Sequence, residues 1–417
     1  MNDLGLKVVK KYIGETVVRI GMMADLYKPH ISGVTNYISL SKQNLEKLGH
    51  EVYVFTFGSE TYQDEETNVI CSQGMPFLDT GYHFNLRHPR YARNLLRTMD
   101  IVHVHHPFIS GSLAIRYCRP YLIPIVFTSH TRYDLYAQAY FPVPIDVIGE
   151  TAIQTFLPVF CRAIDMVIAP SNGMRDVLVR SGVDVPIEVV PNGVDLEPFR
   201  KSLEPRQRSD LGFSQEDVLL IFVGRLGPEK NLAFLIRAFY GLIKAFPNVG
   251  LILVGDGPDR DNLQDRVKQM GIAHRVYFSG SVPYAEVPGL LAMADAFVTA
   301  SVTEVHPLSV IEAMASGLPV LGIQSPGVGD IIVDGVTGLL VQSEDIASFT
   351  AKMARMVTND LERRKMGERA AVEVEQYDIK VTTKNILEHY TTAIENIGWR
   401  KITLRDRFIR LREHWGR

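Results

Sequence analysis

The chain has 417 residues, 46% of them apolar, and a formal net charge of −3, which predicts about two domains and argues against general nucleic-acid binding. No apolar run reaches the roughly 18 residues that a membrane-spanning helix needs, and the N-terminal segment lacks the pattern of a signal peptide. Three cysteines without metal-type spacing predict buried thiols in a reducing, cytoplasmic setting.

Short apolar runs recur along the chain, and each ends in polar or small residues. They cover 17–25, 51–57, 100–106, 124–130, 166–172 and 187–193, followed by 218–225, 251–257, 276–281, 296–301 and 319–323. Such runs, alternating with helix-length segments, predict parallel strands covered by helices on both faces. Ligands of these sheets bind beyond the carboxyl ends of the strands, where the polar residues of interest fall.

The series of strands pauses at 191–209, a segment rich in Pro, Arg and Glu that predicts an interdomain linker. We therefore expect an α/β chain of two Rossmann-like, doubly wound domains, 1–195 and 196–376, which face each other across a cleft. Helices at about 377–417 follow the second domain. The pattern leaves open whether they pack back on the first domain.

In the first domain, two strand ends carry candidate functional residues. Gly33 follows the first strand, where a glycine lets backbone amides approach a phosphate. His130 ends the run at 124–130, at the edge expected to line the cleft, which favours a functional role. His105 and His106 compete for that role, and we expect one of them to pack structurally.

In the second domain, glycine-bearing turns follow three strands. Gly224 permits a close turn, and Arg225 and Lys230 place two cations near the strand end, where they would hold a diphosphate and stabilise it as a leaving group. The alternative is a solvated basic turn. Gly255 lies in a second such turn, and Val282 lies at a third strand end, where main chain would hold a base.

The segment 304–317, EVHPLSVIEAMASG, carries most information about function. Pro307 fits the first position of a helix, and Ser309 can help satisfy the free amides there. A helix start of this kind suits an anion such as pyrophosphate. Glu304 before the helix and Glu312 a turn inside it reach groups on either side, as in a nucleotide-sugar. The alternative is an ordinary surface helix with a capping box.

Together these motifs resemble retaining glycosyltransferase family 4, whose members have the GT-B architecture of two Rossmann-like domains. The matching elements, which also include 170–176 and 189–195, extend over roughly residues 17–345. The resemblance implies a metal-independent reaction without a cofactor, in which a leaving phosphate oxygen helps deprotonate the acceptor hydroxyl. It implies no covalent nucleophile, and no Asp-x-Asp pair stands where a divalent metal would be expected.

The resemblance also assigns roles by position. Glu304 would contact the donor sugar, Glu312 the ribose, and His130 the transferred sugar, while Arg225 and Lys230 would hold the diphosphate. The expected donor-binding residues are Gly33, Gly224, Arg225, Lys230, Gly255, Val282, Glu304, His306, Pro307, Leu308, Ser309 and Glu312, and the catalytic ones His130, Glu304, Arg225 and Lys230. Many members have Gly-Phe-Gly where this chain has Val-His-Pro at 305–307, so the contacts to the sugar stay open.

Two segments point to an anionic membrane surface. Residues 80–99 contain no acidic residue but have Arg87, Arg90, Arg93 and Arg97, which would form one side if this segment were helical. The tail 399–417 includes Trp399 and Trp415, and from residue 400 it holds seven Lys or Arg against two acids. The alternative for the tail is a closing helix packed on the first domain.

Aromatic residues at 131–144, including Tyr136, would line an apolar acceptor entrance next to His130. Within the family, the segments DLYKPHISGV and HHPF look closest to enzymes that glycosylate diacylglycerol. We therefore expect transfer of a hexose from UDP-glucose to a lipid such as 1,2-diacylglycerol by a cytoplasmic enzyme, peripheral on the inner face of the cell membrane. GDP-mannose with a phosphoinositide-type lipid, a soluble sugar acceptor, an epimerase or phosphorylase, and a non-catalytic sugar-nucleotide sensor stay open.

Overall fold

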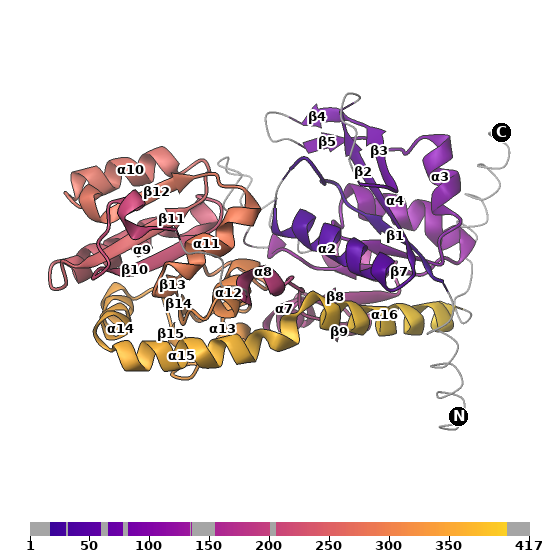
Figure 1. Cartoon of the computed structure of the whole chain (residues 1–417). Helices are drawn as coiled ribbons and strands as arrows, with labels where there is room; N and C mark the ends of the chain where they lie inside the picture. Colours follow the sequence, from indigo (N-terminus) through magenta and orange to yellow (C-terminus); the bar gives the residue numbers. More distant parts are fainter. Residues whose placement is uncertain are drawn as a thin grey trace, which may run out of the picture.

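The chain forms two lobes, each built on one parallel sheet (Figure 1). The computed structural model describes residues 17–30, 32–59, 66–77, 82–133, 135, 155–200 and 206–397. The sheet of the first lobe has seven strands in the order β3-β2-β1-β6-β7-β8-β9, and that of the second has six in the order β12-β11-β10-β13-β14-β15. Both orders reverse direction along the sheet, which confirms two doubly wound domains.

Every apolar run predicted for the first lobe contains a strand. The central strands are buried on both faces of the sheet, which explains their continuous apolar runs, whereas the strand in the last run, at 187–193, is a half-buried edge strand. The elements of this lobe are β1 (Arg19–Met23), α2 (Gly33–Lys47), β2 (Glu51–Gly58), β3 (Val69–Gln73), β4 (Met75–Phe77), β5 (Tyr82–Phe84), α3 (Arg90–Leu96), β6 (Ile101–Val104), α4 (Ile109–Cys118), η1 (Arg119–Tyr121), β7 (Ile125–Thr128), β8 (Met166–Ala169), α7 (Asn172–Arg180) and β9 (Ile187–Val189). The unpredicted β3 is an edge strand of mixed polarity, VICSQ, so it gave no continuous apolar run.

The basic segment 80–99 is helical only in part. Residues 82–84 form β5, which pairs with β4 in an antiparallel ribbon, and the helix α3 begins only after Pro89. Proline at this position keeps the residue before it out of helical geometry, so the helix does not extend back toward β5. The four arginines therefore do not share one helix face.

Two of those four arginines pack on aromatic rings of the same lobe. The guanidinium of Arg97 lies 4.6 Å from the ring centroid of Tyr121, and that of Arg93 lies 5.9 Å from the ring centroid of Tyr117. Both are half-buried, whereas Arg87 and Arg90 are exposed. Cation–π packing thus accounts for half of the basic pattern.

The second lobe contains the remaining predicted strands and one that was not predicted, the short edge strand β15. Its elements are α8 (Glu197–Arg200), η2 (Arg208–Leu211), β10 (Val218–Val223), η3 (Pro228–Lys230), α9 (Leu232–Ile243), β11 (Val249–Val254), α10 (Arg260–Gln269), η4 (Ala273–Arg275), β12 (Val276–Gly280), η5 (Tyr284–Glu286), α11 (Val287–Ala292), β13 (Ala296–Val298), α12 (Leu308–Ala315), β14 (Val320–Ile323), α13 (Val328–Ile331), β15 (Gly338–Val341), α14 (Ile346–Thr358), α15 (Asp360–Glu373), η6 (Val374–Tyr377) and α16 (Ile379–Asn396).

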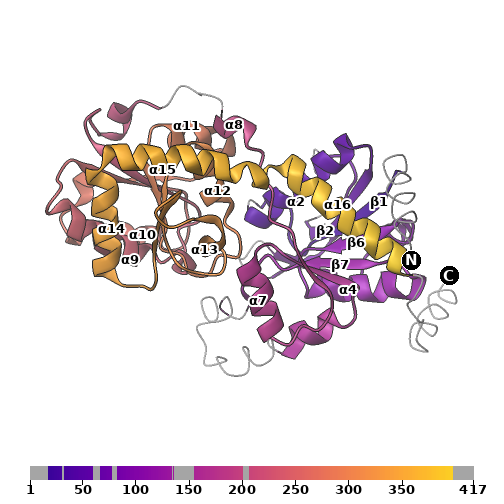
Figure 2. The ribbon, with the colours of Figure 1, turned by 90° about the horizontal axis from the view of Figure 1, so that it is seen from below.

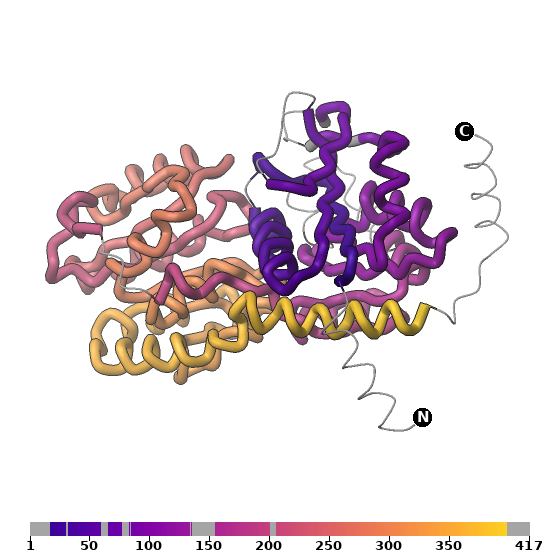
Figure 3. The backbone as a smooth tube through the Cα atoms, turned by 45° about the vertical axis from the view of Figure 1, so that its right-hand side comes forward, coloured from indigo at the N-terminus to yellow at the C-terminus, as the bar shows by residue number. Residues whose placement is uncertain are grey.

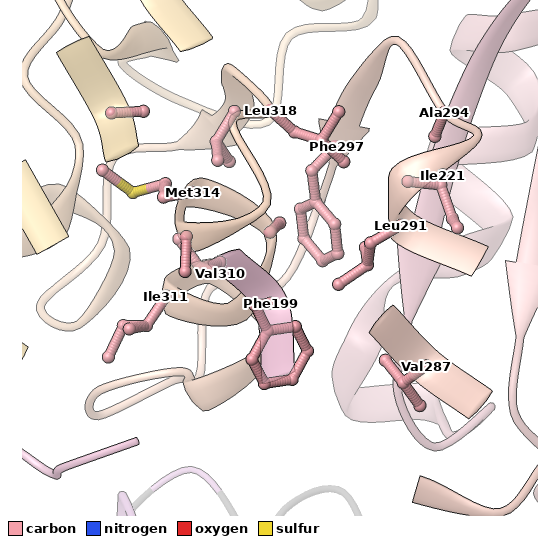
Figure 4. Packing of buried hydrophobic residues seen from close by; sticks show 14 of the residues in the cluster. Phe199, Ile221, Val287, Leu291, Ala294, Phe297, Val310, Ile311, Met314 and Leu318 are labelled. Carbon is pink, nitrogen blue, oxygen red and sulfur yellow. The ribbon is translucent and has the colours of Figure 1, made fainter. Parts of the chain in front are cut away.

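A core on one face of the second sheet fixes the position of α12. Phe297 from β13 lies beside Leu291 of α11 and near Val310 of α12, with Phe199 of α8 alongside (Figure 4). Phe297 is fully buried, and burial of a side chain of this size contributes roughly 1.5–3 kcal/mol to folding. The buried Leu196 and Phe199 also show that the segment predicted as a linker, 191–209, already belongs to this core in part.

The C-terminal helix α16 returns to the first lobe, as Figures 2 and 3 show. Its Ile386, Tyr390 and Ala393 are buried in one cluster with residues of β1, β7 and β8. Gly193 lies where the chain crosses, and a Cβ there would come within 2.1 Å of Thr382 Oγ1. Among the residues described, no helix is both long and apolar enough to cross a membrane.

Candidate active site

Candidate residues from the two lobes meet where α2 and α12 begin. A Cβ placed on Gly33 at the start of α2 would lie 3.9 Å from Leu308 Cδ1 at the start of α12. The loop before α2 lies close to Arg225, since partial burial and the positive charge of Arg225 lower the pKa of His30. Gly33, Leu308 and Arg225 are far apart in sequence, and the fold brings them together.

Three further contacts hold the lobes at this place. The Gly173 N–H donates to Asp330 Oδ2 at 2.7 Å, and the side-chain amide of Asn192 donates to the His306 carbonyl at 3.4 Å. Val305 of the second lobe is buried in a core cluster of the first. The segment that departs from the Gly-Phe-Gly pattern is therefore part of the contact between the lobes.

The start of α2 is capped by its own side chains. Ser32 Oγ accepts from the Thr35 N–H at 3.2 Å, and Thr35 Oγ1 accepts from the Ser32 N–H at 2.7 Å, which forms a capping box. The first turn of α2 contains no acidic residue. The positive end of the helix dipole is therefore not neutralised by a carboxylate of that turn.

The helix α12 begins one residue later than expected. Pro307 is its N-cap, in extended conformation (φ −72°, ψ 115°), and no side chain caps the helix. The predictions of Pro307 as first helical residue and of Ser309 as a cap were therefore wrong, because the extended ψ of Pro307 delays the helix until Leu308. Among the described residues, the N-cap offers no side-chain hydrogen bond to the amides that begin this helix, those of Leu308 and Ser309, and a helix start of this kind suits an anion.

Lys230 and Glu304 form an ion pair, with 2.5 Å between Nζ and Oε1, and both side chains are about one-fifth exposed (20% and 22%). Lys230 is the last residue of η3. The carbonyl of the residue before it, Glu229, accepts hydrogen bonds from Ser301 Oγ at 3.1 Å and Thr303 Oγ1 at 3.2 Å. These two hydroxyls anchor the turn that presents Lys230. The sequence did not single them out: Ser301 ends the apolar run at 296–301, and Thr303 follows it.

The two strand-end turns pack closely on each other at their glycines. Gly224 has φ +154° and Gly255 φ +131°, and a Cβ on Gly255 would lie 2.0 Å from the Gly224 carbonyl oxygen. Both the left-handed conformation and this close backbone contact exclude a side chain. Packing between the turns is thus sufficient reason for Gly255, without a nucleotide. Val282, at the third strand end, is half-buried against the second-lobe core.

Glu312 is buried, with 5% exposure, and its Oε1 accepts a 2.8 Å hydrogen bond from the Tyr284 hydroxyl. Burial raises the pKa of Glu312 to about 7, although the hydrogen bond from Tyr284 opposes that change. The carboxyl group is therefore not fully ionised at neutral pH. Tyr284 itself lies in the segment 279–284 but was not singled out by the sequence.

His306 packs within the contact between the lobes. Its ring lies edge-to-face on Tyr377, with 5.0 Å between centroids, and burial lowers the pKa of His306 to about 3. Its imidazole is thus neutral and only 5% exposed. We therefore expect any contact of His306 with the nucleotide-sugar to be made by its main chain.

The three histidines of the first lobe differ in their contacts. His105 Nδ1 lies 3.0 Å from His130 Nε2, and the ring of Tyr37 packs on His130. His106 Nδ1 instead accepts from the Asp25 N–H at 3.2 Å, and Asp25 accepts from the Ser110 N–H at 2.6 Å at the start of α4. His106 therefore makes structural contacts, and His105 is the partner of His130.

Several residues expected at the acceptor or membrane side cannot be placed. Tyr136, Trp399 and Trp415 lie outside the described residues. Of the aromatic entrance predicted next to His130, Tyr133 lies edge-to-face on Phe108, with 5.3 Å between centroids. Among the described residues, no cluster of three or more His, Cys, Asp or Glu side chains has a metal-binding arrangement.

Comparison with known proteins identifies the family. Residues 31–198 match the model described as Glycosyltransferase Family 4, and residues 204–372 match that of Glycosyl transferases group 1. The alpha-monoglucosyldiacylglycerol synthase of Acholeplasma laidlawii is 30% identical over 342 residues, which cover 79% of this chain and 86% of that protein. The chain belongs to glycosyltransferase family 4.

A second relative and a solved structure extend the comparison of this glycosyltransferase. The alpha-monoglucosyldiacylglycerol synthase of Streptococcus pneumoniae is 28% identical over 406 residues, 93% of this chain and 89% of that protein. The crystal structure of Anabaena Alr3699/HepE in complex with UDP-glucose has a TM-score of 0.73 at 18% identity, covering 90% of this chain and all of that one. At that identity the likeness shows the fold, which confirms the predicted GT-B architecture.

Proposed function

We propose that this glycosyltransferase transfers glucose from UDP-glucose to a hydroxyl group of 1,2-diacylglycerol, with retention of the anomeric configuration. The observation that carries the donor site is the meeting of Arg225, Lys230 and the starts of α2 and α12 across the two lobes. The acceptor and the alpha product are proposed from two relatives that are named alpha-monoglucosyldiacylglycerol synthases.

The diphosphate would lie between the two helix starts. The amides of Leu308 and Ser309 and the positive ends of both helix dipoles favour a group with negative charge there. Arg225 is exposed at the end of β10 and would form charge-assisted hydrogen bonds to the phosphates. When the donor binds, the Lys230 ammonium group would bind the leaving phosphate as well as Glu304. Glu304 would then accept hydrogen bonds from hydroxyl groups of the sugar.

The nucleoside would lie along the other side of α12. Glu312 would accept hydrogen bonds from the ribose through the oxygen that Tyr284 leaves unused, and the main chain near Val282 would contact the base. His130, from the first lobe, would hydrogen-bond the sugar that is transferred. These roles require no metal ion and no group covalently attached to the enzyme.

In the reaction, the bond between the anomeric carbon and the phosphate oxygen breaks, and a bond to the acceptor oxygen forms on the same face. The acceptor proton passes to the leaving phosphate oxygen. The protein contributes by positioning the two substrates and by stabilising the negative charge that develops on the diphosphate.

Gly33→Ala tests the place of the diphosphate. The added methyl group has room in the free protein, since the nearest atom is 3.9 Å away, and Ala is the better residue inside a helix. We expect unchanged or higher thermal stability but at least a roughly 10-fold loss of UDP affinity by calorimetric titration, about 1.4 kcal/mol. Gly241→Ala on α9, where a Cβ lies 3.4 Å from Thr350, is the control. Wild-type UDP affinity in Gly33→Ala would exclude phosphates from this place.

A lipid acceptor requires contact with a membrane, and we propose the segment 86–91, which runs from beyond β5 into the first turn of α3, as one site of it. Leu86 and Tyr91 are exposed there (71% and 61%), next to the exposed Arg87 and Arg90. Exposed apolar and basic side chains in one stretch are typical of surfaces that bind anionic membranes.

Arg87→Glu/Arg90→Glu should weaken co-sedimentation with anionic vesicles at low salt. Loss of two cations alone corresponds to about 2 kcal/mol, roughly a 30-fold lower partition coefficient, and the two added carboxylates act in the same direction. The control is Arg266→Glu/Lys268→Glu on α10 of the second lobe, where both side chains are also exposed. Equal losses in both variants would show a general charge effect and argue against this site.

The proposed function is tested by a screen of donors against acceptors with detection of products by mass. UDP-glucose and GDP-mannose are each combined with diacylglycerol, phosphatidylinositol and soluble sugars in vesicle suspensions. We expect glucosyldiacylglycerol from UDP-glucose, with the alpha configuration by NMR. A mannosylated phosphoinositide, a product from a soluble sugar alone, or no product from any pair would overturn the proposal.

A further inference from the structure

The carboxyl ends of β6 and β7 carry a row of histidines, of which His103 and His105 are fully buried and His130 is half-buried. His103 Nδ1 lies 2.6 Å from the hydroxyl of Tyr390 on α16, and His103 Nε2 lies 2.7 Å from Thr128 Oγ1. The ring of His105 lies 4.1 Å from that of His103 and 5.3 Å from that of His130, between centroids. His130 is thus the last ring of a packed row that begins at Tyr390 of α16.

The contact between His105 and His130 is a single hydrogen bond, 3.0 Å from Nδ1 of the first to Nε2 of the second. Burial lowers the pKa of both imidazoles well below the ordinary value, and the charges on neighbouring histidines act in the same direction. Two neutral rings share one hydrogen between these nitrogens. One ring therefore donates its N–H to the other. The ring that accepts has no hydrogen on the accepting nitrogen, so its own hydrogen is on its other nitrogen.

The second nitrogen of His105 decides between the two arrangements. His105 is fully buried, and its Nε2 has no hydrogen-bond partner within the part of the chain that the structure describes. If His130 donated, His105 would carry an N–H on this Nε2, a buried donor without an acceptor. Such donors are rarer in folded proteins than unpaired acceptors. If His105 donates, only a lone pair stays unpaired.

We infer that His105 donates its Nδ1–H to His130 Nε2 and thereby fixes His130 in the tautomer that carries hydrogen on Nδ1. His105 is then a positioning residue, set in place by its packing on His103. Within the described part of the chain, the hydrogen bond of the His130 ring is the one at Nε2, so the Nδ1–H is the group that His130 presents to a ligand.

The tautomer has a consequence for the proposed function, on which this step depends. A neutral imidazole with Nδ1–H donates to an oxygen of the sugar, and it has no lone pair at that nitrogen to accept the acceptor's proton. His130 would therefore bind and orient the transferred sugar rather than act as a general base. The proton then passes to the leaving phosphate oxygen, as proposed above.

The tautomer is measured without any substrate. Protein labelled with ¹⁵N in its histidines is examined by long-range ¹H–¹⁵N correlation, and the His130 signals are assigned by their loss in His130→Asn. We expect the signature of a neutral ring protonated on Nδ1. A ring protonated on Nε2, or on both nitrogens at pH 7, overturns the inference whatever the enzyme's activity. An Nδ1–H ring in a protein that glycosylates nothing refutes the proposed function instead.

Two variants test the role of His105. His105→Leu removes the donor and should let His130 change to the Nε2–H form, with kcat for UDP-glucose falling on the order of 10-fold and UDP affinity unchanged, since UDP lacks the sugar. His105→Asn keeps an amide donor near Nδ1 and should retain the Nδ1–H form and most of kcat.

The control is His88→Leu, which removes another buried imidazole of the same lobe, one bonded to Ser72 at 2.7 Å. It should lose stability without a change in the His130 signals. An unchanged tautomer in folded His105→Leu contradicts the inference, and if that variant does not fold, the wild-type spectrum and His105→Asn decide.

Discussion

Lys230→Ala should lower kcat by roughly 10²- to 10³-fold, the usual effect of removing one group that stabilises a developing negative charge. Its ammonium group lies at the place proposed for the leaving diphosphate and pairs with Glu304 in the empty protein. Stability should change little, because the pair is partly exposed and ion pairs of that kind contribute about 0–1 kcal/mol. Steady-state kinetics and thermal unfolding measure the two effects.

Two companion variants make this result specific. Arg237→Ala removes an exposed cation from α9 of the same lobe and should leave kcat unchanged. Lys230→Arg keeps the charge and should recover part of the rate. A wild-type kcat in Lys230→Ala would refute the leaving-group role, even if the protein is a glycosyltransferase by other means.

Glu312→Gln should weaken donor binding and, at the same time, stabilise the free protein at alkaline pH. Measured at pH 8, where Glu312 is mostly ionised, loss of this carboxylate as acceptor for the ribose hydroxyls should cost about 1.5–3 kcal/mol of UDP affinity. Burial raises the pKa of Glu312 from 4.5 to about 7, so the folded protein holds this proton more tightly than the unfolded chain does. The stability from this proton is complete below pH 4.5, falls as the pH rises toward 7, and is absent above it.

The size of that stability change follows from the rise in the pKa of Glu312 from 4.5 to about 7, which corresponds to about 3 kcal/mol. The amide introduced by Glu312→Gln does not titrate, so the variant should gain about that much over wild type between pH 4.5 and pH 8 in denaturant unfolding. Glu368→Gln, at an exposed position of α15, is the control and should follow wild type. Unchanged UDP affinity in Glu312→Gln would argue against the ribose contact, and equal pH profiles would argue against a buried, protonated carboxyl group.

The errors made from sequence have a common physical cause. The basic pattern at 87–97 has the spacing of one helix face, but Pro89 delays the helix and two of the arginines pack on Tyr117 and Tyr121. Pro307 fits a first helical position equally well by type, yet its extended conformation makes it the N-cap. Local spacing describes what a segment permits, whereas packing against other segments selects among the permitted states.

What the sequence alone determined was local. Continuous apolar runs specified every strand of the two sheet centres, since a strand buried on both faces needs no distant information to be recognised. Because polar residues at the carboxyl ends of such strands gather at one edge, Gly33, His130, Arg225 and Lys230 could be named as candidates before any contact was known.

Only the tertiary structure decided which groups meet. It placed Gly33 opposite Leu308, Tyr284 on Glu312, His105 on His130 and Tyr390 on His103. These partners come from different strands, lobes or the returning helix, and periodicity within a segment contains no information about the docking of one lobe on another. The protonation of Glu312 and of the histidines depends on that docking as well, because burial is a property of the assembled fold and not of any one segment.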